Sequence, residues 1–187
     1  FIHRFISPEG IIISAQNCMN DETISSIIGY GRMLGCVISG ITVALWKPGH
    51  IIRNNPINDN LTHHVFRVGE FHRRITNRVK NIVDVLSHID SSRVTSNIWG
   101  ERWSKLTANA SSNPMVMTGL TPKKVAQNPQ ARLIQIQISK ESVLVGKALN
   151  YQIEPIGGLS ANTWARANEK EVYNMLDSNL TLSYGSK

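Results

Sequence analysis

Short apolar runs separated by turn residues dominate the first half of the chain, and runs of this kind predict β-strands. The expected strands are 10–17 (GIIISAQN), 32–45 (RMLGCVISGITVAL), 50–54 (HIIRN) and 63–70 (HHVFRVGE), followed by a brief extended piece at 91–97. The tripeptide Lys-Pro-Gly at 47–49 predicts a turn between two of them. Residues 1–6 are typical of the last turns of a helix.

Two helices are expected between these strands. The first, DETISSIIGYG at 21–31, has Asp21 as its N-cap and a stop signal at Gly29 or Gly31. The second covers 73–89, where apolar residues recur at helical spacing and form one face. The members of this face are Ile75, Val79, Ile82, Val83, Leu86 and Ile89.

After Asn97 the pattern becomes helical. Asn97 is a plausible N-cap, and Glu101 suits the first turn of a helix over 98–118. A second helix is expected at about 129–150, with Ile134, Ile138, Val145 and Leu149 on an apolar stripe, and a third at about 161–177. The fold class is therefore α/β followed by all-α, with domains at 1–96 and 97–187.

Composition narrows the class of protein. The 187 residues are 41 % hydrophobic and 18 % charged, which is typical of an ordered globular chain. The longest apolar run, 33–46, is too short to span a bilayer, and 1–10 lacks the pattern of a secretion signal. Two cysteines, Cys18 and Cys36, are too few for a disulfide framework, so reduced thiols and a cytoplasmic location are expected.

The formal charge of +7 does not by itself indicate a nucleic-acid partner. The densest basic group lies mostly along the predicted helix at 73–89, where a solvated helix face explains it, and no aromatic residues alternate with it to stack on bases. Its members are Arg67, His72, Arg73, Arg74, Arg78 and Lys80. We expect no nucleic-acid partner and no membrane contact. No metal site is expected either, because the adjacent His63 and His64 lack acidic or cysteine partners.

Candidate chemistry lies on the helix at 98–118. Lys105, Asn109 and Asn113 recur every four residues and so form one polar ridge, beside a sector of apolar residues. An ammonium group and two carboxamides suit a small oxygen-rich anion, since asparagine both donates and accepts hydrogen bonds. A plain solvent-exposed face would also explain the ridge. However, asparagine is a poor helix former, and Pro114 predicts a kink that would aim the Asn113 side chain.

These residues resemble a known family. The pattern Lys-Leu-x-x-Asn-x-x-x-Asn-Pro at 105–114 resembles the substrate-binding helix of the ketopantoate reductases (2-dehydropantoate 2-reductases). IIISAQNCMN, FRVGE, NIWGERWSKL and IGGL-x-x-x-x-W are similar to other stretches of that family, and the resemblance covers nearly the whole chain. It implies the C-terminal part of a Rossmann-type NADP-binding domain followed by a helical domain of the 6-phosphogluconate-dehydrogenase type.

The resemblance also implies an activity and its residues. The family reduces 2-dehydropantoate, a 2-keto acid, to pantoate with NADPH, in pantothenate and coenzyme A biosynthesis. By resemblance, Lys105 donates a proton to the ketone oxygen, Asn109 and Asn113 hold the substrate's hydroxyl and carboxylate end, and Asn17 contacts the cofactor near the nicotinamide ribose. Asn17 ends a predicted strand, where ligands bind in α/β sheets.

The chain departs from the family pattern in several places. The family's phosphate-binding turn, Gly-x-Gly-x-x-Gly, is not found, nor are its later Ser and Glu, and Cys18 stands where the family usually has Gly. We therefore expect this polypeptide alone to bind NADPH weakly or not at all and to be incomplete as an enzyme. Two alternatives stay open: a non-catalytic remnant or helical homodimerisation module, and a related reductase of another 2-keto acid.

Overall fold

The computed structural model describes residues 2–57 and 64–185. The chain forms two compact units, Phe1–Arg102 and Trp103–Lys187, and each is described by itself. This boundary falls inside a helix, α3, which runs from Ile98 to Ser111. The division into functional domains at 96/97 stays a prediction.

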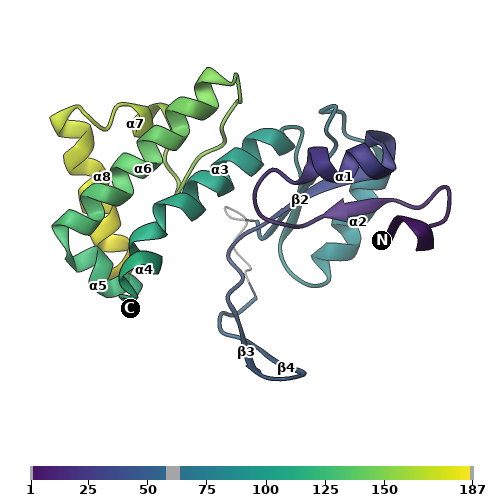
Figure 1. Ribbon diagram of the computed structural model, residues 1–187, viewed down its shortest axis with the longest axis horizontal. Coiled ribbons are helices and arrows are strands. Elements are labelled where there is room, and N and C mark those ends of the chain that lie inside the picture. Colours follow the sequence, from purple (N-terminus) through teal and green to yellow (C-terminus); the bar gives the residue numbers. More distant parts are fainter. Residues whose placement is uncertain (1, 58–63, 186–187) are drawn as a thin grey trace. The chain divides into compact units, whose positions relative to one another are not determined.

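The first unit is built on a four-stranded mixed sheet with the order β1-β2-β5-β6. β1 pairs with β2 in parallel, β2 with β5 antiparallel, and β5 with β6 in parallel. The elements of this unit, with 3₁₀ helices labelled η, are η1 (Ile2–Phe5), β1 (Ile12–Ser14), α1 (Asp21–Ile28), η2 (Tyr30–Arg32), β2 (Met33–Ile38), β3 (Val43–Lys47), β4 (His50–Arg53), β5 (Phe66–Gly69), α2 (Asn77–Ser87) and β6 (Ser92–Val94) (Figure 1).

One face of the sheet forms an apolar core with α2. Leu34 and Cys36 of β2 and Phe66 and Val68 of β5 are buried together with Val79 of α2. The helix predicted at 73–89 is shorter in the structure, because Thr76 is its N-cap and accepts a hydrogen bond from the backbone N–H of Val79. Six residues of the predicted range lie outside α2, four before it and two after it. Of these, Ile75 and Ile89 are exposed, and Arg73 and Arg74 belong to the preceding loop.

The opposite face is covered by the start of α3. Gly35 and Gly69 are direct partners across β2 and β5, and both lie against the side chain of Ile98. A Cβ on Gly35 would come within 2.5 Å of Ile98 Cγ1, so this close approach requires glycine. Beside it, the buried Glu101 forms ion pairs with Arg67 and Arg93. Asn97 caps the helix as predicted, since its Oδ1 accepts from the Gly100 N–H at 3.2 Å.

β3 and β4 form a separate hairpin around the predicted Lys-Pro-Gly turn (Figure 1). Its apolar side chains face solvent: Leu45 is 71 %, Trp46 73 % and Ile51 70 % exposed. Its base is tied to the rest of the unit by Arg53, which forms an ion pair with the buried Asp90. The hairpin therefore gains little from burial in the described structure.

The second unit is helical. After α3 come α4 (Asn113–Thr118), α5 (Pro122–Gln127), α6 (Pro129–Ala148), α7 (Ala161–Ala165) and α8 (Lys170–Gly185). Their core contains Ile136, Val143, Ile156, Trp164, Ala167 and Leu176. The single helix predicted at 98–118 is wrong: Ser112 separates α3 from α4, and Pro114 occupies the first turn of α4. The single helix at 161–177 is likewise two helices, α7 and α8.

The apolar stripe predicted on α6 is not its buried face. Ile134, Val145 and Leu149 are exposed. The buried face instead contains the small residues Ala131, Ser139 and Gly146, along with Gln135, Ile136 and Val143. Gly146 lies directly against the indole of Trp103, whose Nε1 would be 2.2 Å from an added Cβ. The buried face thus combines Ile136 and Val143 with small residues, and the small side chain at Gly146 allows the close approach of Trp103.

Candidate functional site

Lys105 and Asn109 lie one turn apart on α3, and both are partly buried. The deeper side of this helix is held by hydroxyl groups. Ser104 Oγ donates to the Pro155 carbonyl at 2.9 Å, and Thr107 Oγ1 lies 2.7 Å from Ser142 Oγ. These contacts fix the rotation of α3, so that Lys105 and Asn109 occupy the edge of the buried face, as the spacing predicted.

Asn113 is exposed and begins α4 rather than continuing α3. The break at Ser112 falls between Asn109 and Asn113, so Lys105, Asn109 and Asn113 do not share one continuous helix. Pro114 is buried beneath it, so the backbone at this point is fixed. A cavity of about 200 Å³ lies beside this break, lined by Ala108, Ser111, Ser112, Ser139, Trp164 and Asn179 among others. None of the three predicted substrate residues is among its lining residues.

Asn17 lies three residues beyond β1, in the loop that leads to α1, and its side chain is exposed. Arg102 of α3 holds this loop. Its guanidinium donates to the carbonyl of Gln16 and to that of Ser14 at 2.8 Å. The same group pairs with Asp21 at 2.7 Å, and both side chains of this ion pair are almost fully buried. The loop that carries Asn17 is therefore attached to α3.

The structure corrects the predicted N-cap of α1 and explains the departure from the family pattern at Cys18. Asp21 is not the N-cap of α1; Asn20 occupies that position, and Asp21 is the buried partner of Arg102. Cys18 has a φ of 67°, in the left-handed region that favours glycine. The family's usual Gly thus matches a backbone conformation that Cys18 adopts here despite its Cβ.

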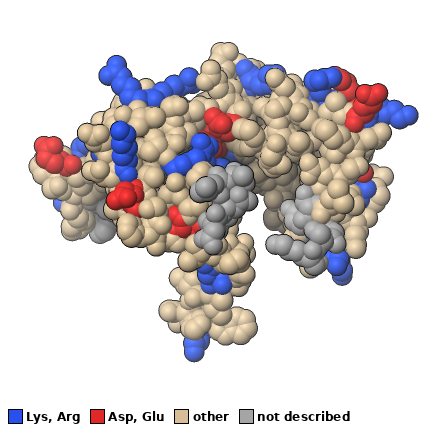
Figure 2. All heavy atoms as spheres, turned by 180° about the vertical axis from the view of Figure 1, so that it is seen from behind, with Lys and Arg blue, Asp and Glu red and all other residues tan. Residues whose placement is uncertain are grey.

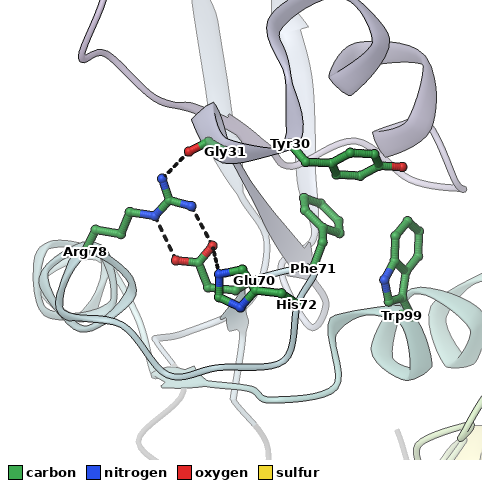
Figure 3. A pocket seen from close by; sticks show the side chains of 7 residues that line it. All are labelled: Tyr30, Gly31, Glu70, Phe71, His72, Arg78 and Trp99. Atoms are coloured by element: carbon green, nitrogen blue, oxygen red, sulfur yellow. Dashed lines mark hydrogen bonds and ion pairs between the residues drawn. The ribbon is translucent and has the colours of Figure 1, made fainter.

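A second group of charged residues lies at the end of the sheet opposite the Asn17 loop, beside a cavity of about 530 Å³ (Figure 3). Buried Glu70 accepts hydrogen bonds from Arg78 Nε at 2.7 Å, from Arg78 Nη2 at 2.6 Å and from Thr76 Oγ1 at 2.6 Å. Burial by itself raises the pKa of Glu70. The hydrogen bonds from Arg78 and Thr76 and the charges of Arg78 and His72 outweigh burial, so the pKa is lowered. The hydrogen bond to Glu70 likewise raises the pKa of Arg78.

The described part of the chain offers little support for a metal site or a nucleophilic thiol. No group of three or more potential metal ligands occurs among the described residues, and His63 lies outside them. Burial raises the pKa of the Cys36 thiol to about 11, against the opposing charges of Arg102 and Arg67, so this thiol is no nucleophile at neutral pH. In the face shown in Figure 2, Lys and Arg are scattered among acidic residues. No described helix is long and apolar enough to cross a membrane.

Comparison with known proteins identifies the fold. No protein-family model matches the sequence, and no curated protein matches it. Among solved structures, the 2-dehydropantoate 2-reductase of Geobacter metallireducens GS-15 superposes with a TM-score of 0.72 at 18 % identity, over 97 % of this chain and 55 % of that one. This chain has the ketopantoate reductase fold. The resemblance seen in the sequence is confirmed at this level, as is the mixed α/β fold with a helical C-terminal part.

Two further structures extend the comparison. D-mandelate dehydrogenase in complex with NADH matches with a TM-score of 0.72 at 15 % identity, over 96 % of this chain and 54 % of that one. A dimeric ketopantoate reductase from Staphylococcus aureus matches with a TM-score of 0.55 at 16 % identity, over 94 % of this chain and 68 % of that one. The chain thus spans about half the length of the first two proteins named here.

Sequence reasoning missed two parts of these sites. The Arg102–Asp21 pair joins residues 81 positions apart, and no local pattern relates them. The cavity beside Glu70 also joins three separate segments. A signal for Arg102 did exist, because an arginine follows directly after Glu101 on the face of the helix that the prediction treated as buried.

Proposed function

We propose that this chain belongs to an NADPH-dependent reductase of a 2-keto acid, and that the substrate is 2-dehydropantoate. The single observation that carries this proposal is the fold likeness to 2-dehydropantoate 2-reductase, combined with Lys105 and Asn109 on α3. Arg102 adds support, since its guanidinium holds the loop that carries Asn17.

The donor set fits the proposed reaction. Lys105 donates a proton to the ketone oxygen as this oxygen becomes a hydroxyl. The carboxamides of Asn109 and Asn113 bind the hydroxyl and carboxylate end of the substrate, since amides both donate and accept. The nicotinamide cofactor supplies the hydride when bound. Asn17, exposed on a loop whose carbonyls are held by Arg102, fits a contact with its ribose.

The test measures NADPH oxidation by the complete gene product that carries this chain, with 2-dehydropantoate, pyruvate and phenylglyoxylate as substrates. Lys105→Ala is expected to lower turnover by about 10²–10⁴-fold with little effect on cofactor binding, because it removes the general acid. Asn113→Ala is expected chiefly to raise the KM. Lys123→Ala, at an exposed lysine of α5, is the matched control and should leave both unchanged.

Unchanged turnover in the Lys105→Ala variant would remove this lysine from the mechanism. A preference for phenylglyoxylate would instead favour the second candidate, a reductase of another 2-keto acid, which the likeness to D-mandelate dehydrogenase supports. Replacing NADPH with NADH in the same assay tests the cofactor.

We further propose that the chain forms a homodimer through its helical unit. The exposed apolar face of α6, which includes Ile134, Val145 and Leu149, supports this surface. The dimeric state of the S. aureus reductase of the same fold supports the stoichiometry. If the protein reduces no keto acid, the alternative function is a dimerisation module without catalysis, formed through this face of α6.

A further inference from the structure

The cavity beside Glu70 has an aromatic wall (Figure 3). Tyr30 comes from η2, Phe71 from the loop after β5, and Trp99 from the first turn of α3. The ring centroids of Tyr30 and Phe71 are 5.7 Å apart in an edge-on arrangement, and those of Phe71 and Trp99 are 5.0 Å apart and tilted. Three segments far apart in the sequence thus place their rings along one side of the same hollow.

The position of this cavity separates it from the proposed reductase site. β1 runs parallel to β2 with Ser14 opposite Gly35, so the chain beyond Ser14, which carries Asn17, continues toward the Ile38 end of β2. Tyr30 and Gly31 precede Met33 and therefore lie at the other end of that strand. The cavity and Asn17 thus belong to opposite ends of the sheet.

The polar groups of the cavity are mainly donors. The carboxylate of Glu70 already accepts three hydrogen bonds, and Arg78 neutralises its charge. Arg78 also donates from Nη1 to the Gly31 carbonyl at 2.6 Å. These bonds use three of the five N–H groups of a guanidinium, which leaves two more donors. The half-exposed His72 ring faces Glu70 instead, with its Nε2 3.6 Å from Oε2, and its Nδ1 accepts from the Arg74 N–H at 3.2 Å. A ligand that matches this inventory carries an oxygen acceptor.

We propose that this cavity binds an aromatic carboxylate. Its ring would lie on the wall of Tyr30, Phe71 and Trp99, and its carboxylate would accept hydrogen bonds from the remaining N–H groups of Arg78. A volume of about 530 Å³ lies within the usual range for small-molecule sites. This proposal does not depend on the reductase activity.

The test uses the 187-residue chain with ¹⁵N-labelled tryptophan and three probes followed by NMR. Benzoate has both the ring and the charge, cyclohexanecarboxylate has only the charge, and benzyl alcohol has only the ring. Benzoate is expected to shift the Trp99 indole N–H resonance saturably and to bind about tenfold more tightly than either analogue, because only it uses both the aromatic wall and the charged donors. The resonance is assigned by its loss in Trp99→Leu.

Two variants and a control complete the design. Trp99→Leu should weaken benzoate binding several-fold, and so should Tyr30→Leu, which changes a half-exposed side chain. Trp46→Leu on the exposed hairpin should not. Binding is measured by ligand-observed NMR on variants that keep a native circular dichroism spectrum. If Trp99→Leu does not fold, the benzoate affinity of Tyr30→Leu alone tests whether the aromatic wall binds the ligand. Absence of benzoate binding, equal binding of cyclohexanecarboxylate, or unchanged binding by a folded Trp99 or Tyr30 variant would overturn the proposal.

Discussion

Cys18 has a backbone conformation that disfavours any residue with a Cβ. Its φ of 67° places the Cβ of an L-residue against the following carbonyl, at a cost of about 1–2 kcal/mol. Glycine removes that cost but loses more conformational entropy on folding, by about 0.5–1 kcal/mol. We therefore predict that Cys18→Gly raises the free energy of unfolding by about 0.5–1 kcal/mol, measured by urea denaturation. Cys18→Ala keeps the Cβ and is the control: a gain equal to that of glycine would assign the effect to the exposed thiol.

Glu70 should make the stability of the first unit depend on pH. Its pKa is lower in the folded chain than its ordinary value of 4.5, so the folded state favours the ionised carboxylate. This contribution is fully present above pH 4.5 and is lost as the pH falls through the folded-state pKa. We predict that the unfolding free energies of wild type and Glu70→Gln differ most near neutral pH and converge in acid.

The control for this prediction is Glu169→Gln. Glu169 also pairs with an arginine, Arg166, but both side chains are largely exposed to water, which screens the pair. Its substitution should change stability little at any pH. A Glu70→Gln difference that stays constant down to acid pH would contradict the assignment.

At the scale of elements, the contact of α3 with the sheet depends on two glycines that face each other. Because an added Cβ at Gly35 would meet the branched side chain of Ile98, we predict that Gly35→Ala destabilises the chain by about 1–3 kcal/mol. Gly31→Ala is the matched control, since nothing lies within 4 Å of a Cβ there. Urea midpoints of the two variants provide the measurement, and equal midpoints would show that Ile98 simply shifts aside.

Elements with a local signal were predictable from the sequence. The Lys-Pro-Gly turn, the central part of the apolar face of α2 and the Asn97 cap follow from residues a few positions apart, and the structure has all three, although Ile75 and Ile89 of that face are exposed. The buried face of α6 was not predictable in this way. Its stripe of large apolar residues gave a periodic signal, but packing against Trp103 selects the face with Gly146. Closeness of approach, which hydropathy does not encode, decided which face is buried.

At the scale of the whole molecule, several stretches of the sequence pointed to the fold, and the motif at 105–114 pointed to Lys105, Asn109 and Asn113 as candidate site residues. The sequence contains no hint of how the Asn17 loop is held. Arg102 reaches that loop from 86 positions away, together with the buried Asp21. Such pairs depend on how strands and helices meet in three dimensions. The roles of Lys105, Asn109, Asn113 and Asn17 therefore stay predictions from the sequence, and the contacts that hold the Asn17 loop could not be predicted from it.

Two surfaces are candidates for the proposed homodimer contact. The exposed face of α6 and the β3–β4 hairpin both present large apolar side chains to solvent, and such patches mark interaction sites. We predict that the α6 face mediates the dimer, because its apolar residues recur along a 20-residue helix and offer a longer continuous surface than the short hairpin. Val145→Glu places a charge in that face and should shift the chain toward monomer in analytical ultracentrifugation.

Leu45→Glu places the same charge on the hairpin and tests the competing surface. If α6 forms the interface, this variant keeps the wild-type sedimentation behaviour, since burying an unpaired carboxylate is costly only where a partner covers it. Dissociation by Leu45→Glu but not by Val145→Glu would assign the contact to the hairpin and refute the helical interface. A third variant, Val116→Glu, changes an exposed apolar residue of α4. If all three variants dissociate the chain equally, the association is a non-specific contact of exposed apolar residues rather than a defined dimer.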